Sequence, residues 1–219
     1  MSWKQIAADR RAAVYESIPA EWRITVPSPL PKNLLSLPAK YLSAEEVEIV
    51  SVTANTVLVN IRTGKWTSEQ VTRAICHSAA VAHQLCNCLT DFFPEEAIAR
   101  AKELDANKSS AKGKLYGLPI SLKDCVDLKG KDSAIGFIGL LGNPRQEDAK
   151  LVKLLYEQGA VFYCKTNVPT SMLMAETDNN LMGRCNNPHN ITLTPGGSSG
   201  GEGALILLKG SFIGVGTDM

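Results

Sequence analysis

The sequence of residues 115–165 predicts a strand, then a helix, then a second strand. This order constrains the fold more than any other feature of the sequence. Residues 115–130, "LYGLPISLKDCVDLKG", are punctuated by Gly and Pro and predict a strand followed by a turn. Residues 147–159 predict a helix that ends at Gly159, and the apolar run 160–165 predicts a buried strand. A helix between two strands is typical of a parallel βαβ unit, so we expect an α/β fold.

The segment before this unit is expected to be mainly helical. Residues 1–17 predict an amphipathic helix, and the Pro-rich residues 18–38 predict an extended segment that wraps the surface. Capping boxes, in which Ser or Thr precedes Glu or Gln by three positions, predict helix starts at Ser43 and Thr67. A further helix is expected to begin at Pro94.

Two more elements are expected near the end of the sequence. Residues 198–208 predict a helix entered from a glycine loop, and residues 211–217 predict another strand. We therefore divide the chain into an N-terminal helical region with a Pro-rich wrapping segment, residues 1–110, and an α/β core, residues 111–219.

Composition excludes several classes of protein. The net charge of +1 and the lack of a dense Lys/Arg cluster argue against nucleic acid as a partner. No apolar run approaches the ~18 residues of a membrane span, and the N-terminus lacks the apolar core of a secretory signal, so we expect no membrane association and a cytoplasmic protein. The six cysteines lack the spacing of a zinc site. We expect reduced thiols, no metal and no cofactor.

A glycine- and serine-rich block, "TPGGSSGGEGALILL" at residues 194–208, is the candidate for function. A flexible linker is disfavoured because the apolar residues 204–208 follow directly and need burial. A phosphate-binding loop is disfavoured because Glu202, rather than Lys, follows the glycines. A nucleophile elbow at 196–200 would need a preceding strand and a later histidine, and no histidine follows His189.

Serine chemistry at this block therefore needs a base other than histidine. His77 and His83 lie in a predicted helix and His189 lies in a loop, and histidines in such places are more often ordinary polar or packing residues than catalytic ones. A lysine can act as a base if burial lowers its pKa far below the usual value of about 10.4. Lys123 follows the apolar strand residues 119–122 and is the candidate. The alternative is that Lys123 extends to solvent from the strand end or pairs with Asp124.

These segments, in this order, resemble the amidase signature family of serine hydrolases. The resemblance covers residues 116–124, 159–172, 187–206 and 214–219, and the N-terminal part is most similar to fungal acetamidase-like general amidases. It implies the N-terminal part of the amidase signature fold. That fold has a mixed β-sheet core flanked by helices and preceded by an N-terminal helical region.

The resemblance implies a Ser-Ser-Lys triad. Lys123 corresponds to the base, and Ser198 corresponds to the bridging serine that passes a proton between the lysine and a nucleophilic serine. The peptide bond between Gly197 and Ser198 is expected to be cis.

Other site residues are also implied by the resemblance alone. Ser199 and Asp218 correspond to supporting polar residues, and Met172 lies in a loop whose backbone contacts substrate in relatives. The family's nucleophile belongs to a Gly-Thr-Asp-x-Gly-Gly-Ser motif, of which residues 216–219 supply the first four positions. Backbone donors starting at Met219 correspond to the oxyanion hole. We therefore expect an N-terminal fragment of an amidase that is inactive alone.

The implied reaction is hydrolysis of small, acetamide-like carboxylic amides to an acid and ammonia or an amine. The expected partner is a small-molecule amide, and the resemblance leaves room for a homodimer in intact relatives. Two alternatives remain: a non-catalytic pseudoenzyme or binding fragment of an amidase, and the amidase subunit of a tRNA-dependent amidotransferase. A nucleotide-binding protein is a more remote alternative.

Overall fold

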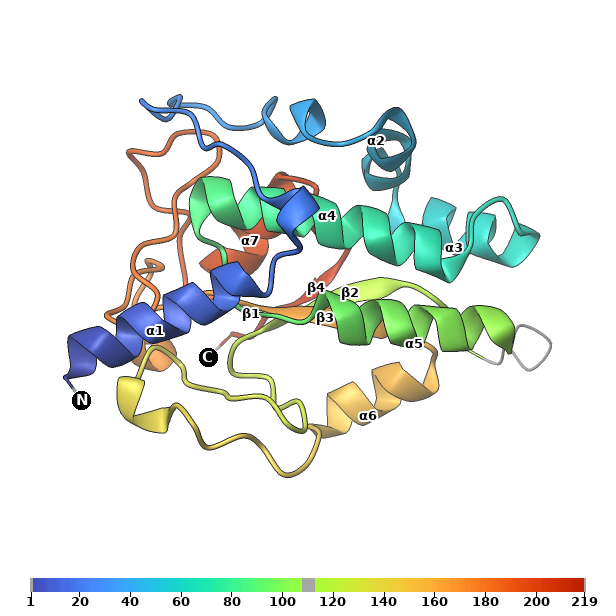
Figure 1. Ribbon diagram of the computed structural model, residues 1–219. Coiled ribbons are helices and arrows are strands. Elements are labelled where there is room, and N and C mark those ends of the chain that lie inside the picture. The colour runs from blue at the N-terminus through green and yellow to red at the C-terminus, as the bar shows by residue number, and fades with distance from the viewer. Residues whose placement is uncertain (1, 108–112, 219) are drawn as a thin grey trace.

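The computed structural model describes residues 2–107 and 113–218 and has a mixed α/β architecture (Figure 1). Four strands form one sheet in the order β1-β3-β2-β4. Strand β3 is antiparallel to β1 and parallel to β2, which is also parallel to β4. The expected α/β class is confirmed. The strands are β1 Leu89–Phe92, β2 Pro119–Lys123, β3 Val161–Thr166 and β4 Gly214–Val215.

The predicted βαβ unit is β2, helix α6 (Lys150–Glu157) and β3. Gly159 ends the helical segment with a φ of +87°, a left-handed conformation that favours glycine. A Cβ atom at this position would lie 2.8 Å from the Cα atom of Tyr116, so only glycine allows this close approach. The glycine thus fixes how closely the chain turns from α6 into β3.

Three of the remaining helices begin where the sequence predicts, whereas helix α3 (Ala54–Thr63), which starts after Thr53, was not expected. Ser43 and Thr67 both form complete capping boxes, and Pro94 is the first residue of its helix. The helix after Thr67 is buried along most of its length because it packs between the sheet and other helices. These helices are α1 Trp3–Glu16, α2 Ala44–Ser51, α3 Ala54–Thr63, α4 Ser68–Cys86, α5 Pro94–Ala106 and α7 Gly200–Leu207.

Helices cover both faces of the sheet. In Figure 1, α4 and α7 lie above the sheet and α6 lies below it. The Pro-rich segment arches over the top, with short 3-10 helices η1 (Ala20–Trp22) and η2 (Pro38–Lys40). Backbone hydrogen bonds join this segment to the loop before the glycine block, from Leu34 N to Pro188 O at 2.8 Å and from Ile191 N to Lys32 O at 2.9 Å. The wrapping segment therefore supports the loop that leads to α7.

Strand β1 was not expected from the sequence. Its four residues, "LTDF", contain a polar pair and carry no clear alternation. The strand forms because β3 supplies its partners, for example Cys164 opposite Phe92. Although β1 lies within residues 1–110, it belongs to the same sheet as the α/β core. The division of the chain at residue 110 stays a prediction.

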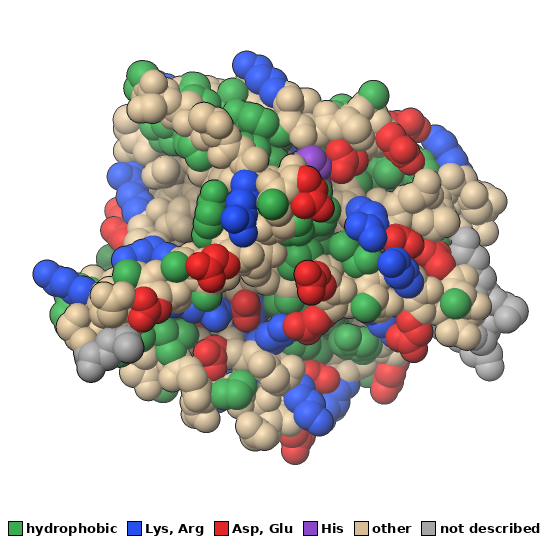
Figure 2. Space-filling model, in the orientation of Figure 1, with side chains coloured by type: hydrophobic (Ala, Val, Ile, Leu, Met, Phe, Trp, Pro, Cys, Tyr) green, Lys and Arg blue, Asp and Glu red, His purple; other side chains and the backbone are tan. Residues whose placement is uncertain are grey.

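The surface and the thiols agree with the composition. Figure 2 shows Lys/Arg and Asp/Glu side chains interspersed over the visible face rather than gathered in one patch. All six cysteines are free, as expected, and five of them are buried. Across residues 2–107 and 113–218, no helix combines the length and apolar character needed to cross a bilayer.

Candidate active site

The structure brings Lys123 and Ser198 together. Lys123 is the last residue of β2 and has no exposed surface. Its Nζ atom donates to Ser198 Oγ at 2.7 Å. Burial lowers the pKa of the Lys123 amine, and the neighbouring Cys125 and acidic groups oppose this shift. Lys123 does not extend to solvent, so that alternative is wrong.

Asp124 has partners of its own. One carboxylate oxygen accepts from Thr90 Oγ1 at 2.6 Å, and the other accepts from the Ile135 backbone N–H at 2.6 Å. The carboxylate therefore fixes the turn after β2 to strand β1. The other alternative, an ion pair between Lys123 and Asp124, is therefore not observed in the structure.

Ser198 lies at a glycine corner that leads into α7. The Gly197–Ser198 peptide bond is cis, as the resemblance implies. A Cβ atom at Gly197 would lie 2.4 Å from Glu176 O and 2.6 Å from Met174 O. Only glycine fits against this neighbouring backbone, so residues 174–176 and the glycine corner are held in close contact.

Thr217 completes the surroundings of the lysine. Lys123 Nζ donates to Thr217 Oγ1 at 2.6 Å. The Thr217 backbone N–H donates to Ser199 Oγ at 3.3 Å, and Ser199 Oγ lies 3.3 Å from Thr217 O. Ser199 thus holds the segment after β4 beside Lys123. Thr217 was not among the predicted site residues, although its place in the Gly-Thr-Asp motif could have identified it.

The other predicted residues have less direct positions. Asp218 is exposed, and its negative charge favours the protonated form of Lys123. Met172 ends the 3-10 helix η5 (Thr170–Met172) with a φ of +60°, next to Ser171 at +59°. Two successive non-glycine residues in this region are uncommon. Met172 lies two positions before Met174, which contacts Gly197. Met219 lies outside the described residues.

A buried acid beside this site was missed as a site residue. Glu202, in the first turn of α7, is 5% exposed. Its Oε2 atom lies 2.6 Å from Ser121 Oγ, and its Oε1 atom accepts from Thr166 Oγ1 at 3.0 Å. Burial raises the pKa of Glu202 to about 7. The sequence could have indicated this residue, because an acid directly before an apolar helical run must be buried and must form hydrogen bonds.

A second lysine is as buried as Lys123. Lys165, in β3, has no exposed surface, and burial lowers the pKa of its amine. Its Nζ atom donates to Ser133 Oγ at 2.8 Å and to the backbone oxygen of Asp132. These bonds anchor the loop that follows β2, so Lys165 has a structural explanation.

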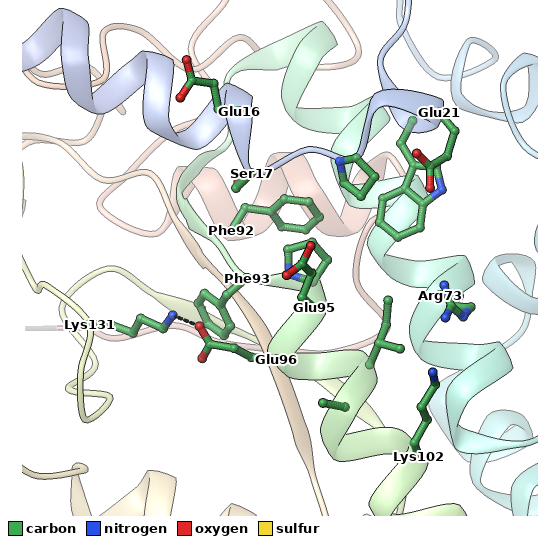
Figure 3. Close-up of a pocket in the computed structure, with 15 residues that line it drawn as sticks. Glu16, Ser17, Glu21, Arg73, Phe92, Phe93, Glu95, Glu96, Lys102 and Lys131 are labelled. Atoms are coloured by element: carbon green, nitrogen blue, oxygen red, sulfur yellow. Dashed lines mark hydrogen bonds and ion pairs between the residues drawn. The ribbon is translucent and has the colours of Figure 1, made fainter.

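A cavity of about 790 Å³ lies elsewhere, between η1, α4 and the start of α5 (Figure 3). Figure 3 shows Phe92 and Phe93 near its middle, and Lys131 paired with Glu96 at 2.5 Å. Neither Lys123 nor Ser198 lines it. In the part of the chain that the structure describes, no three His, Cys, Asp or Glu side chains are grouped to hold a metal. The candidate site is therefore defined by buried contacts rather than by cavity size.

The fold and this site define a class of protein that comparison with known families identifies. Residues 70–219 match the family model described as Amidase. This match spans more than half of the sequence, so the chain belongs to the amidase family.

Particular relatives agree with this assignment. The acetamidase of Aspergillus oryzae is 45% identical over 223 residues, covering 100% of this chain and 41% of the relative. The acetamidase of Emericella nidulans is 43% identical, covering 100% of this chain and 40% of the relative. The expected similarity to fungal acetamidase-like amidases is confirmed.

A solved structure shows the same arrangement of elements. Fatty acid amide hydrolase superposes with a TM-score of 0.92 at 32% identity, covering 100% of this chain and 40% of that chain. The chain therefore spans about two fifths of the length of the relatives that it matches.

Proposed function

We propose that this chain is part of an amidase that hydrolyses small carboxylic amides to an acid and ammonia or an amine. The observation that carries the proposal is the 2.7 Å contact between the buried Lys123 amine and Ser198 Oγ. The relatives named acetamidase support a small, acetamide-like substrate.

In the proposed mechanism, Lys123 acts as the base in its neutral form. We assign the attacking serine to the last position of the Gly-Thr-Asp-x-Gly-Gly-Ser motif, of which residues 216–219 are the first four positions. Its proton passes to Ser198, whose own proton passes to Lys123, while the serine oxygen attacks the amide carbonyl. The tetrahedral anion accepts hydrogen bonds from backbone N–H groups that start at Met219. The proton then returns through Ser198 to the departing nitrogen, and water hydrolyses the acyl-enzyme.

The remaining predicted residues support this relay. Gly197 allows the corner that directs Ser198 toward the lysine, and Ser199 holds the segment that carries the motif. Asp218 adds negative charge near Lys123. Met172 belongs to the loop that we propose contacts the substrate through its backbone.

The test measures ammonia release from acetamide by two proteins. One is the chain of residues 1–219, and the other is a hybrid in which these residues replace the matching part of the Aspergillus oryzae acetamidase. We expect the hybrid to hydrolyse acetamide and the chain alone to release no ammonia, because the attacking serine is not among residues 1–219. In the hybrid, Lys123→Ala and Ser198→Ala should each lower kcat by about 10²–10⁴-fold.

A matched control is Lys165→Met in the same hybrid, which removes another buried lysine. If that hybrid folds, it should keep most of its activity. Undiminished turnover by the folded Lys123→Ala hybrid would contradict the assigned base. Robust turnover by residues 1–219 alone would contradict the assigned nucleophile.

A further inference from the structure

A second cluster of buried polar side chains lies beside the lysine and serine pair. Glu202 is its acid, and the other members are the hydroxyl groups of Ser121, Thr166 and Ser211, each less than 5% exposed. The cluster joins α7 to β2, to β3 and to the segment before β4. It connects the same elements that carry Lys123 and Ser198.

The oxygens of this cluster form a chain of three contacts. Glu202 Oε2 lies 2.6 Å from Ser121 Oγ, which lies 2.9 Å from Ser211 Oγ. Ser211 Oγ in turn lies 2.9 Å from the backbone oxygen of Ile213. The structure has Ser211 as the donor in this contact, since a carbonyl oxygen only accepts. Ser211 therefore accepts the hydrogen of Ser121, which has none left for the carboxyl group.

The three contacts have only two hydroxyl hydrogens between them, so this arrangement needs a third hydrogen from the acid. An ionised carboxylate would leave the 2.6 Å contact with Ser121 without any hydrogen, whereas a protonated carboxyl group supplies it. The other carboxyl oxygen accepts from Thr166 Oγ1 at 3.0 Å, as the carbonyl oxygen of a neutral acid can. The contacts of Glu202 with Ser121 and Thr166, and those of Ser211 with Ser121 and Ile213, then each have one donor and one acceptor.

We propose that Glu202 is held as a neutral carboxylic acid that donates to Ser121, and that it is a positioning residue for Lys123. The positioning role rests on the proposed amidase function. The neutral state of Glu202 is independent of that function and can be tested in residues 1–219.

Strand β4 is shaped around this carboxyl group. Gly214 is paired with Ser121 in the sheet. A Cβ atom at Gly214 would lie 1.8 Å from Glu202 Oε2 and 2.6 Å from Ser121 Oγ. The carboxyl group thus occupies the space of a side chain at position 214. The close packing excludes water that could otherwise solvate an anion.

The titratable groups that face Glu202 come from two strands. Lys123 faces it from β2, and Tyr163 and Cys164 face it from β3. Burial raises the pKa values of Tyr163 and Cys164 well above their usual range, so both are neutral near pH 7. An ionised Glu202 would stabilise the ammonium form of Lys123. Below about pH 7 a neutral Glu202 removes that attraction and favours the uncharged form of the lysine.

The first test titrates Glu202 by NMR in residues 1–219, with Glu labelled by ¹³C at Cδ. We expect its signal, assigned by its loss in Glu202→Gln, to titrate at about pH 7 rather than near 4.5. Ser211→Ala should lower this pKa, because Ser121 can then donate its hydrogen to the carboxylate. Ser78→Ala, a buried serine that donates to Lys209 O at 2.9 Å, is the matched control and should not change it. Titration near 4.5, or no response to Ser211→Ala, would overturn the neutral acid.

The second test examines Lys123 with lysine labelled at Cε, its signal assigned by its loss in Lys123→Ala. Glu202→Gln imitates the neutral acid at every pH, since its amide donates to Ser121 and its oxygen accepts from Thr166. Wild-type Glu202 is ionised above about pH 7 and then stabilises the ammonium form of Lys123, so we expect Lys123 to titrate on the order of one pH unit lower in the variant. An unchanged Lys123 titration would overturn the positioning role.

The two proposals fail in different ways. If the hybrid enzyme does not hydrolyse acetamide while both titrations behave as expected, the amidase function is wrong and the neutral Glu202 stands. If the hybrid is active, Glu202→Gln should shift the kcat profile to lower pH by the same amount as the Lys123 titration, with KM unchanged. A change in KM alone would contradict action through Lys123.

Discussion

Lys123 Nζ lies 2.7 Å from Ser198 Oγ, although 75 positions separate the two residues in the chain. The lysine is carried to this point by β2, and the serine by the glycine corner before α7. Both side chains are held by elements that are themselves fixed, so the contact does not depend on a flexible loop alone. A buried amine in contact with a hydroxyl group is the chemical core of the proposed site.

The first prediction concerns the pH dependence of hydrolysis. Burial lowers the pKa of Lys123, and the base must be uncharged, so kcat of the hybrid should rise as pH increases through this lowered pKa. Lys123→Arg should remove the rise together with the activity, because Arg stays charged at all accessible pH values. The measurement is a kcat profile for acetamide from pH 5 to about 10. A profile that falls across this range would contradict a neutral lysine base.

The second prediction concerns Thr217, whose Oγ1 atom accepts from Lys123 at 2.6 Å. Thr217→Val removes an acceptor that stabilises the ammonium form, so the pKa of Lys123 should fall further, on the order of one pH unit. NMR titration of labelled lysine in residues 1–219 measures the shift. Thr192→Val, at an exposed loop position, is the control and should leave the titration unchanged. A higher pKa for Lys123 in Thr217→Val would exclude this role.

Much of the fold follows from local signals in the sequence. The capping boxes at Ser43 and Thr67 need only residues three positions apart, and both form as expected. The sequence predicts a strand over residues 211–217, but the structure has a strand only at Gly214–Val215. This strand pairs with Ser121 and Leu122 of β2. Strand β1 was missed because its strand character comes from its distant partner β3.

The candidate site also has one part that the sequence predicts and one part that only the fold determines. Lys123 and Ser198 could be chosen because a family motif marks both positions. The contacts of Glu202 with Ser121 and of Thr217 with Lys123 span 81 and 94 positions. Such contacts depend on which strands become neighbours in the sheet, and local pattern does not determine that. A buried acid can be suspected from its apolar surroundings, but its partners come only from the fold.

The third prediction compares two glycines near Glu202. Gly214→Ala should destabilise the chain by about 1–3 kcal/mol, because its Cβ atom would lie 1.8 Å from Glu202 Oε2. Gly203→Ala, in α7, meets no atom within 4 Å and should stabilise the helix by about 0.5–1 kcal/mol. Denaturant unfolding of residues 1–219 measures both free energies. Equal effects of the two substitutions would show that the carboxyl group does not fill the space at position 214.

The fourth prediction concerns stability as a function of pH. The pKa of Glu202 is about 7 in the folded chain against 4.5 when exposed, so the native state holds a proton that the unfolded state releases between these values. The free energy of unfolding should therefore receive its full contribution from Glu202 below pH 4.5. That contribution should be lost as pH rises from 4.5 to about 7, by about 3 kcal/mol in total.

Glu202→Gln isolates this contribution, because its side chain keeps the hydrogen-bonding pattern of the neutral acid and does not titrate. The variant should be about as stable as the wild type at pH 4.5 and more stable at pH 8, as measured by urea unfolding at a series of pH values. Glu48→Gln, at an exposed residue on α2, is the control and should leave the slope between pH 4.5 and 7 unchanged. A Glu202→Gln variant that keeps the wild-type slope would mean that another group takes up the proton. The cluster of Ser121, Ser211 and Glu202 would then have to be satisfied without a protonated acid.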